Sequence, residues 1–268
     1  MRMFMEKNSL LSEERLKIIA DQASEIVKRT GKFLTEASIA SVSQKEGHAN
    51  FVTDLDVKVQ EMLVKKLAPL IPEASFLLEE SDVEPRLSDI VWIIDPIDGT
   101  QNFICRNRQS AISVGLFSQG TGLLGIVYNP FLEELFTAVK GNGAFLNGFP
   151  IRVSEKPLFD AIICAGTSPY YEELHEKSLH AVSALFPLCA DFRRFGSAAL
   201  EICYTACGRC DGYFEYRLSP WDYAGASVIL LEAGGRIGSI EYGQIDYTKK
   251  TGIVAGGQTV YEALRKIL

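Results

Sequence analysis

Residues 91–100 have the sequence VWIIDPIDGT, in which the candidate functional residues of the chain are most concentrated. The first four residues are a β-branched and aromatic apolar run, which predicts a buried strand. Because Pro96 has no backbone donor, it cannot continue a central strand, and we expect the strand to end there. Asp95 and Asp98 are therefore expected at the end of a buried strand, before a glycine, Gly99, that allows a ligand to approach the backbone.

Two carboxylates in this arrangement suit a divalent metal together with a phosphate group. Gly99 and Thr100 can present backbone N–H groups to an anion, especially if a helix begins there. A plain turn with a capping threonine explains the same spacing almost as well. The motif by itself therefore leaves both interpretations open.

Composition and charge exclude several classes of protein. The chain has 268 residues, of which 47% are hydrophobic and 23% charged, as in an ordinary soluble globular protein. The net charge of −7 argues against binding to nucleic acid or to an anionic membrane surface. The N-terminal MRMFMEKNSLLSEERLK lacks a signal-peptide core, and no stretch approaches about 18 consecutive apolar residues. We therefore expect a cytoplasmic protein.

The six cysteines are too few for a disulfide framework. Cys203, Cys207 and Cys210 are spaced i, i+4 and i+7, which predicts one face of a helix. A zinc site would need a fourth ligand, and none stands nearby at a suitable spacing. We expect the cysteines to be buried thiols that act as small apolar residues.

Hydrophobic periodicity predicts a layered fold of helices and sheets. Helical spacing covers residues 12–30 and 53–67, and the runs SFLL, VWII, AISVGLF, LLGIVY and ELFTAVK predict an antiparallel meander. After the turn-rich GNGAFLNGFP, helices and strands mix. We expect strands at 162–166, 212–216 and 253–257, and helices at 171–186, 197–207, 221–235 and 258–268.

Two motifs resemble the signatures of a known family. Residues 92–100 with Asn102 and Phe103 are similar to the first signature of the inositol monophosphatase family, and WDYAGA at 221–226 is similar to the second. Weaker matches follow in order along most of the chain: VTDLD at 52–56, EES at 79–81, GIVYNP at 125–130, GAFLNG at 143–148 and GSAA at 196–199.

The resemblance implies a mixed α/β (α+β) fold, the five-layered αβαβα sandwich of the inositol monophosphatase and fructose-1,6-bisphosphatase type. It also implies one domain over residues 1–268, with two intimate halves at roughly 1–155 and 156–268, and a homodimer.

The resemblance also implies a site for two or three Mg²⁺ ions. Glu79 matches a ligand of the first metal, as does the backbone carbonyl of Ile97. Asp95 matches the carboxylate that bridges two metals, and Asp98 and Asp222 match the ligands of the second. Oxygen-only ligands favour Mg²⁺ over zinc. In agreement, the chain has three histidines and none lies inside a motif.

Asp56 has two interpretations that the sequence does not separate. Thr53 and Asp56 form a capping-box-like pattern at a helix start, which would make the aspartate structural. The family resemblance instead places Asp56 among the catalytic residues near the metal cluster, with Lys45 as a counter-charge.

The implied reaction is hydrolysis of a phosphate monoester by a metal-activated water. Thr100 and Glu79 would orient the water for in-line attack, and a second Mg²⁺ would stabilise the leaving alkoxide. No phosphoenzyme is expected. Inhibition by lithium is implied as well.

Substrate contacts are implied from both halves of the chain. Glu215 matches the acceptor of a sugar or inositol hydroxyl. Further contacts are implied for Asp98, Gly99, Thr100, Gly196, Ser197, Ala198 and Asp222. Arg193 and Arg194 would meet a second phosphate or pair with surface acids. Leu78 and Arg108 replace a glycine and a proline common in the family, which bears on the shape of the pocket.

The most direct expectation is therefore an inositol-phosphate phosphatase acting on a small phosphorylated polyol or sugar. The alternatives are a sister phosphatase for NADP, fructose 1,6-bisphosphate or 3′-phosphoadenosine phosphates, or a regulatory protein that binds a protein partner.

Overall fold

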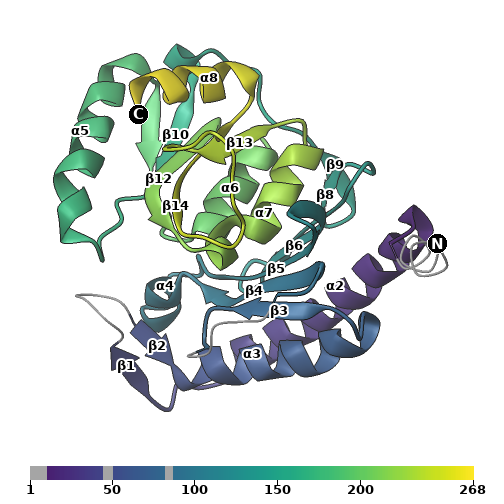
Figure 1. Ribbon diagram of the computed structural model, residues 1–268. Coiled ribbons are helices and arrows are strands. Elements are labelled where there is room, and N and C mark those ends of the chain that lie inside the picture. Colours follow the sequence, from purple (N-terminus) through teal and green to yellow (C-terminus); the bar gives the residue numbers. More distant parts are fainter. Residues whose placement is uncertain (1–10, 45–50, 82–86) are drawn as a thin grey trace.

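The computed structural model describes residues 11–44, 51–81 and 87–268. Residues 1–10 of the N-terminal stretch discussed above and the proposed counter-charge Lys45 lie outside the described residues. Layers of helices and sheets alternate from the bottom to the top of Figure 1: helices, a sheet, helices, a second sheet and helices. The predicted αβαβα sandwich is confirmed.

The helices confirm the periodicity, but some of their ends differ from the prediction. The helix expected at 171–186 begins at His175, and the helix expected at 221–235 ends at Glu232.

Ser12 caps the N-terminal helix by accepting a hydrogen bond from the Arg15 backbone N–H. The helix was expected to end near Thr30 but continues to Glu36. Gly31 lies inside the helix, where a Cβ would lie 2.6 Å from the Tyr128 ring, so close packing accounts for a glycine at this position.

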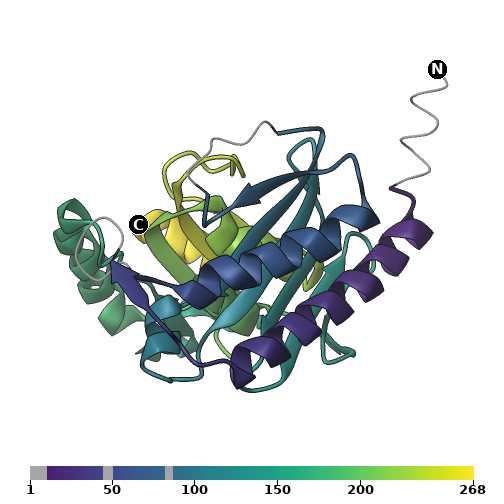
Figure 2. The same ribbon diagram turned by 90° about the horizontal axis from the view of Figure 1, so that it is seen from below.

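The bounds of the helices are α2 (Glu13–Glu36), α3 (Asp54–Leu67), α4 (Thr100–Ile104), α5 (His175–Leu185), α6 (Ala198–Ala206), α7 (Pro220–Glu232) and α8 (Gln258–Ile267). Helices α2 and α3 run side by side across one face of the first sheet (Figure 2). None of the helices within the described residues is long and apolar enough to span a bilayer.

The first sheet has seven strands in the order β3-β4-β5-β6-β7-β8-β9. The bounds are β3 (Ser75–Leu78), β4 (Ile90–Asp98), β5 (Ala111–Ser118), β6 (Thr121–Asn129), β7 (Glu134–Val139), β8 (Ala144–Leu146) and β9 (Phe149–Ile151). The predicted meander is confirmed from β4 onward. The prediction is wrong for β3, which runs parallel to β4. Residues 79–89 separate the two strands, and a parallel pair needs a connection longer than a hairpin turn.

Strands β8 and β9 span most of GNGAFLNGFP and end at Ile151, a stretch that the sequence analysis described only as turn-rich. Asn147 and Gly148 form their turn with φ of 50° and 80°. Two consecutive positive φ values are typical of the tight hairpin turn that an Asn-Gly pair favours. The signal was therefore present in the sequence.

The second sheet has five strands in the order β11-β10-β12-β14-β13. The bounds are β10 (Ile162–Ala165), β11 (Asp191–Arg193), β12 (Gly212–Leu218), β13 (Arg236–Ser239) and β14 (Thr251–Gly256). A separate pair, β1 (Val42–Gln44) and β2 (Phe51–Thr53), precedes α3. Helices α6 and α7 fill the space between the two large sheets, and α5 and α8 cover the outer face of the second.

The cysteines only partly follow the expectation. Cys164, Cys203 and Cys210 are buried, but Cys105 is exposed. Helix α6 ends at Ala206, so Cys210 lies beyond it and does not share its face, contrary to the prediction. The Cys207 backbone N–H closes the helix by bonding to the Cys203 carbonyl.

Candidate active site

A cleft of about 280 Å³ opens where the end of β4 meets the first turns of α4, α6 and α7. Asp56 and Arg193 do not line this cleft, but most of the site residues expected from the sequence do: Glu79, Asp95, Ile97, Asp98, Gly99, Thr100, Gly196, Ser197, Ala198, Glu215 and Asp222. Residues from both halves of the chain are therefore brought together.

Strand β4 does not end at Pro96, as the sequence suggested, but continues to Asp98. Its register against β5 shifts between Asp95, which lies opposite Ser113, and Asp98, which lies opposite Ala111. This bulge removes the proline from the hydrogen-bond ladder. The Ile97 N–H donates to Asp95 Oδ1 at 2.9 Å.

Glu79 and Asp95 are neighbours because of the parallel register of β3 and β4. Leu78 lies opposite Ile94 in this register. Glu79, which follows Leu78, is therefore beside Asp95, which follows Ile94. The two carboxyl groups are joined by a hydrogen bond. Burial raises the pKa of Asp95 well above its ordinary value, and the charge of Glu79 acts in the same direction.

Asp98 is held by the first turn of α6. Its Oδ2 atom accepts hydrogen bonds from Ser197 Oγ and, at 2.8 Å, from the Ala199 N–H. Burial raises the pKa of Asp98 to about 7, although both hydrogen bonds act in the opposite direction. The carboxyl group is therefore fixed in orientation.

Asp222 lies in the first turn of α7, where Pro220 begins the helix. Its Oδ2 atom accepts a hydrogen bond from the Ser219 N–H at 2.7 Å, so the residue caps the helix while it lines the cleft. Burial raises the pKa of Asp222 well above its ordinary value, and the charge of Glu79 adds to this effect.

Thr100 connects the cleft to Asp56. The Thr100 hydroxyl lies 3.1 Å from the Ile97 carbonyl oxygen and 3.3 Å from Asp56 Oδ1. Asp56 Oδ2 accepts hydrogen bonds from the Thr53 N–H at 2.7 Å and the Thr53 hydroxyl at 2.6 Å. The capping role of Asp56 is thus observed, and its other oxygen contacts Thr100 from behind the cleft wall.

Gly99 adopts φ of +83° as the N-cap of α4. A side chain there would be strained, and a Cβ would lie 2.9 Å from the Gln109 carbonyl oxygen. Glycine therefore allows the backbone to turn sharply from β4 into α4 at the edge of the cleft.

Glu215 stands on β12 at the opposite wall. Its Oε1 atom accepts from the Ser168 N–H at 3.0 Å, and its Oε2 atom accepts from the Tyr213 hydroxyl at 2.9 Å. Gly166 packs directly on it, because a Cβ there would lie 2.1 Å from Glu215 Oε2. Burial raises the pKa of Glu215, against the effect of these hydrogen bonds.

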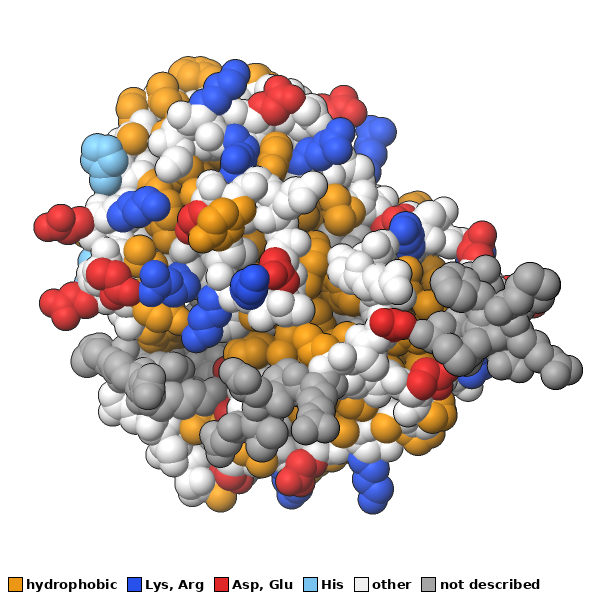
Figure 3. Space-filling view, viewed as in Figure 1, with side chains coloured by type: hydrophobic (Ala, Val, Ile, Leu, Met, Phe, Trp, Pro, Cys, Tyr) orange, Lys and Arg blue, Asp and Glu red, His pale blue; other side chains and the backbone are white. Residues whose placement is uncertain are grey.

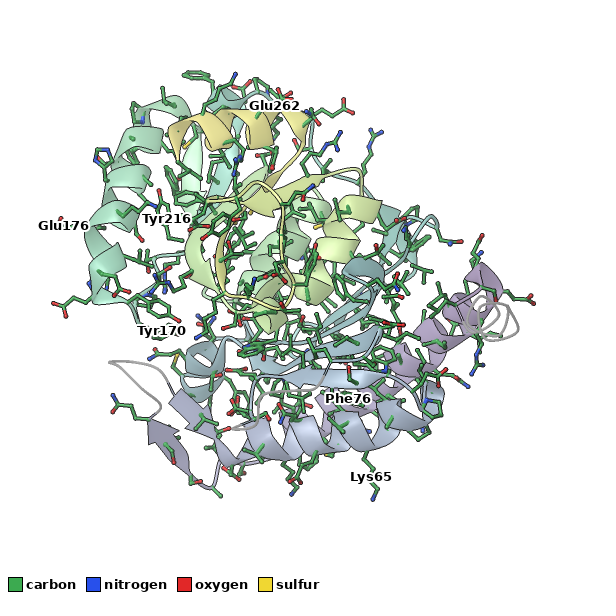
Figure 4. All side chains as sticks on the ribbon, in the orientation of Figure 1. Lys65, Phe76, Tyr170, Glu176, Tyr216 and Glu262 are labelled. Carbon is green, nitrogen blue, oxygen red and sulfur yellow. The ribbon has the colours of Figure 1, made fainter. Side chains whose placement is uncertain are left out.

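The outer wall contains residues that sequence reasoning missed: Tyr170, Tyr171, Glu201, Arg217 and Lys250. Arg217 follows Glu215 by two positions on β12, and strand alternation could have placed both on one face. Tyr170 lies between the lower end of α5 and α4 (Figure 4). No local sequence pattern identifies Tyr170 as a cleft residue, because the residues of this wall come from loops that are far apart in the sequence.

The two arginines of the sequence prediction differ in position. Arg193 pairs with Asp191 and does not line the cleft, whereas Arg194 lines it and donates from Nε to Thr167 Oγ1 at 3.0 Å. Lys and Arg side chains gather on the surface between α5 and α4 (Figure 3). The cleft thus has an acidic floor and a basic rim.

The donor set suits Mg²⁺. Within the described segments, no ion pair involves Asp95, Asp98 or Asp222, so no fixed cation neutralises these acids. No group of three or more His, Cys, Asp or Glu side chains in those segments forms a ready metal cage. Mg²⁺ does not require one, because it keeps several waters and binds through one or two carboxylates and the substrate phosphate.

Comparisons with known proteins agree with the fold and the cleft. The chain matches the profile of the Inositol monophosphatase family over residues 13–268. The Nus factor SuhB of Escherichia coli (strain K12) is 37% identical over 231 residues, which cover 85% of this chain and 86% of the relative. The crystal structure of the extragenic suppressor protein suhB from Bartonella henselae superposes with a TM-score of 0.85 at 34% identity, covering 94% of this chain and 97% of that chain.

A second similar structure contains bound Mg²⁺ and phosphate. The crystal structure of an IMPase/NADP phosphatase complexed with Mg²⁺ and phosphate has a TM-score of 0.85 at 25% identity and covers 94% of this chain and 95% of that chain. The layered fold and the acid-floored cleft together define a phosphatase of the metal-dependent class. The chain belongs to the inositol monophosphatase family.

Proposed function

We propose that this protein hydrolyses a small phosphorylated polyol, with inositol monophosphate as the preferred class of substrate. The observation that carries the proposal is the convergence of Glu79, Asp95, Asp98 and Asp222 on one cleft. Neighbouring negative charges raise the pKa of Asp95 and of Asp222, and a divalent cation in the cleft would compensate those charges.

Glu79, Asp95 and the Ile97 carbonyl would hold one Mg²⁺, and Asp95, Asp98 and Asp222 a second. When bound, Mg²⁺ supplies Lewis-acid polarisation of the phosphate and activation of water. The similar IMPase/NADP phosphatase, described as complexed with Mg²⁺ and phosphate, supports this assignment.

The protein's own groups orient the reactants. Thr100 and Glu79 stand at the floor of the cleft, where they would align the attacking water. Asp56, hydrogen-bonded to the Thr100 hydroxyl, would hold that hydroxyl in place. Gly99 and Thr100 would offer backbone N–H groups to the phosphate, and Ser197 holds the Asp98 carboxyl group.

The polyol part of the substrate is assigned to Glu215. A carboxylate oxygen accepts more than one hydrogen bond, so Glu215 retains acceptor capacity beside Ser168 and Tyr213. Gly196, Ser197 and Ala198 would form the adjoining wall. This arrangement favours a substrate with several hydroxyl groups.

The basic rim favours a second candidate substrate that carries a further anionic group. Arg194, Arg217 and Lys250 line the cleft opposite the acidic floor. Of these, Arg217 pairs with Glu173 at 2.6 Å and Lys250 lies 3.5 Å from the Tyr171 hydroxyl. A bisphosphorylated sugar or NADP would place its second phosphate near them.

A regulatory role is the alternative from a different class, favoured by the name Nus factor that the Escherichia coli relative carries. The two roles are separable, because binding to a protein partner would not require turnover.

The test is phosphate release from a panel of monoesters with Mg²⁺ and with excess chelator. We expect release from inositol monophosphate that stops in chelator. Release from NADP or fructose 1,6-bisphosphate but not from inositol monophosphate would favour the second candidate. No Mg²⁺-dependent release from any of them would contradict the enzyme assignment.

A further inference from the structure

Gln60 forms a two-point hydrogen-bonded contact with the backbone of Glu80. Its Nε2 atom donates to the Glu80 carbonyl oxygen at 2.6 Å, and its Oε1 atom accepts from the Glu80 N–H at 2.9 Å. The side chain is buried, with 6% of its surface exposed. It therefore replaces, with one amide, both partners that a neighbouring strand would supply to this residue.

The contact lies just beyond the end of strand β3, where the sheet no longer supplies hydrogen-bond partners to the backbone. Strand β3 ends at Leu78 and stands at one end of the strand order. The Glu80 N–H belongs to the peptide bond that joins Glu80 to Glu79. A hydrogen bond to this N–H fixes the orientation of that peptide group and, with it, the direction in which the Glu79 side chain leaves the backbone.

One face of α3 reaches both sides of the catalytic floor. Asp56 and Gln60 are four residues apart and thus neighbours on the helix surface. Asp56 Oδ1 contacts the Thr100 hydroxyl, and Gln60 holds Glu80. Both side chains are buried, and Val59 and Leu63 anchor the helix in the core.

We propose that Gln60 is a positioning residue that sets the affinity of the site for divalent metal by fixing the Glu79–Glu80 peptide. The inference rests on the proposed function, since it concerns the carboxylate assigned to the first metal. A purely structural Gln60 would contribute to the free energy of unfolding alone. A positioning Gln60 also contributes to metal affinity.

The test is Mn²⁺ binding to the full chain, measured as the loss of the free Mn²⁺ signal in electron paramagnetic resonance. Gln60→Met keeps the length and helix propensity of the side chain and removes both hydrogen bonds. Loss of a group that orients a metal ligand typically weakens metal affinity by about 10- to 100-fold, and we expect this range for Gln60→Met. Gln60→Asn, too short to reach Glu80, should weaken binding similarly and serves if the Met variant does not fold.

Leu63→Ala is the matched control, since Leu63 is buried on the same helix and lies in the core away from the cleft. It should lower stability against urea and leave the Mn²⁺ affinity of the folded protein unchanged. Wild-type affinity in a folded Gln60 variant, or equal weakening in Leu63→Ala, would overturn the inference. If the wild-type chain itself neither binds Mn²⁺ nor releases phosphate, the proposed function fails instead.

Discussion

Ser197 donates a hydrogen bond to Asp98, although the two residues lie 99 positions apart in the chain. Asp98 ends β4 in the first sheet, and Ser197 is the N-cap of α6, where its hydroxyl also accepts from the Leu200 N–H at 3.3 Å. One hydroxyl therefore caps a helix of the second half and orients a carboxyl group of the first.

Ser197→Ala should affect both stability and turnover. Loss of an N-cap serine costs about 0.5–2 kcal/mol, and we expect a decrease of this size in the free energy of unfolding. Turnover should fall as well, because Asp98 loses its hydroxyl donor and is then held by backbone N–H groups of the first turn of α6 alone. Ser197→Thr, which retains the hydroxyl, is the control. If the alanine variant unfolds in urea like the wild type and has the wild-type rate, the hydroxyl contributes neither to stability nor to turnover.

Glu201 should give the protein a specific dependence of stability on pH. Burial raises the pKa of this glutamate from its ordinary value of 4.5 to about 8, although its Oε1 atom accepts a hydrogen bond from the Phe195 N–H. Between these values the unfolded chain is ionised at this position while the folded chain keeps its proton. The folded state thus binds more protons, and stability falls as the pH rises through this window.

Glu201→Gln is nearly isosteric and cannot titrate. Urea unfolding near pH 5 and near pH 8, without divalent metal, should show the wild-type chain losing more stability than the variant over this range. Parallel pH profiles for the two chains would mean that Glu201 does not titrate in this window.

Glu215→Gln should separate a polyol pocket from an unspecific phosphatase cleft. A hydrogen bond to a charged group contributes roughly 1.5–3 kcal/mol, so kcat/KM on inositol monophosphate should fall by about ten- to a hundredfold. The rate on p-nitrophenyl phosphate, which has no matching hydroxyl, should hardly change. Equal loss on both substrates would place Glu215 in the structural core or beside the metals.

The site residues that lie in sequence motifs could be predicted from the sequence. Their arrangement in space could be predicted only in part. Asp95 and Asp98 stand in one motif after an apolar run, so their place at the end of a buried strand follows from local sequence. The bulge that keeps Pro96 within β4 does not, because it depends on pairing with β5. The parallel pairing of β3 with β4, which brings Glu79 beside Asp95, likewise depends on contacts between strands and not on the local sequence of either strand.

The residues of the rim and the contacts that support the site could not be predicted from the sequence and are seen only in the folded structure. Tyr170 and Lys250 reach the cleft from loops that no periodic pattern connects. Gln60 reads as an ordinary polar position of a helix, and only the packing of α3 against the end of β3 reveals its contact with Glu80. Asp56 was ambiguous in the sequence because one carboxylate both caps α3 and contacts Thr100.

The central claim is that Asp95 holds divalent metal for phosphate hydrolysis, and Asp95→Asn tests it most directly. The substitution keeps the side-chain volume and removes the charge, so the variant should fold. Phosphate release from inositol monophosphate at saturating Mg²⁺ should be abolished in it. A folded Asp95→Asn variant that retains more than about a tenth of the wild-type rate, a loss of under roughly 1.4 kcal/mol, would contradict the account.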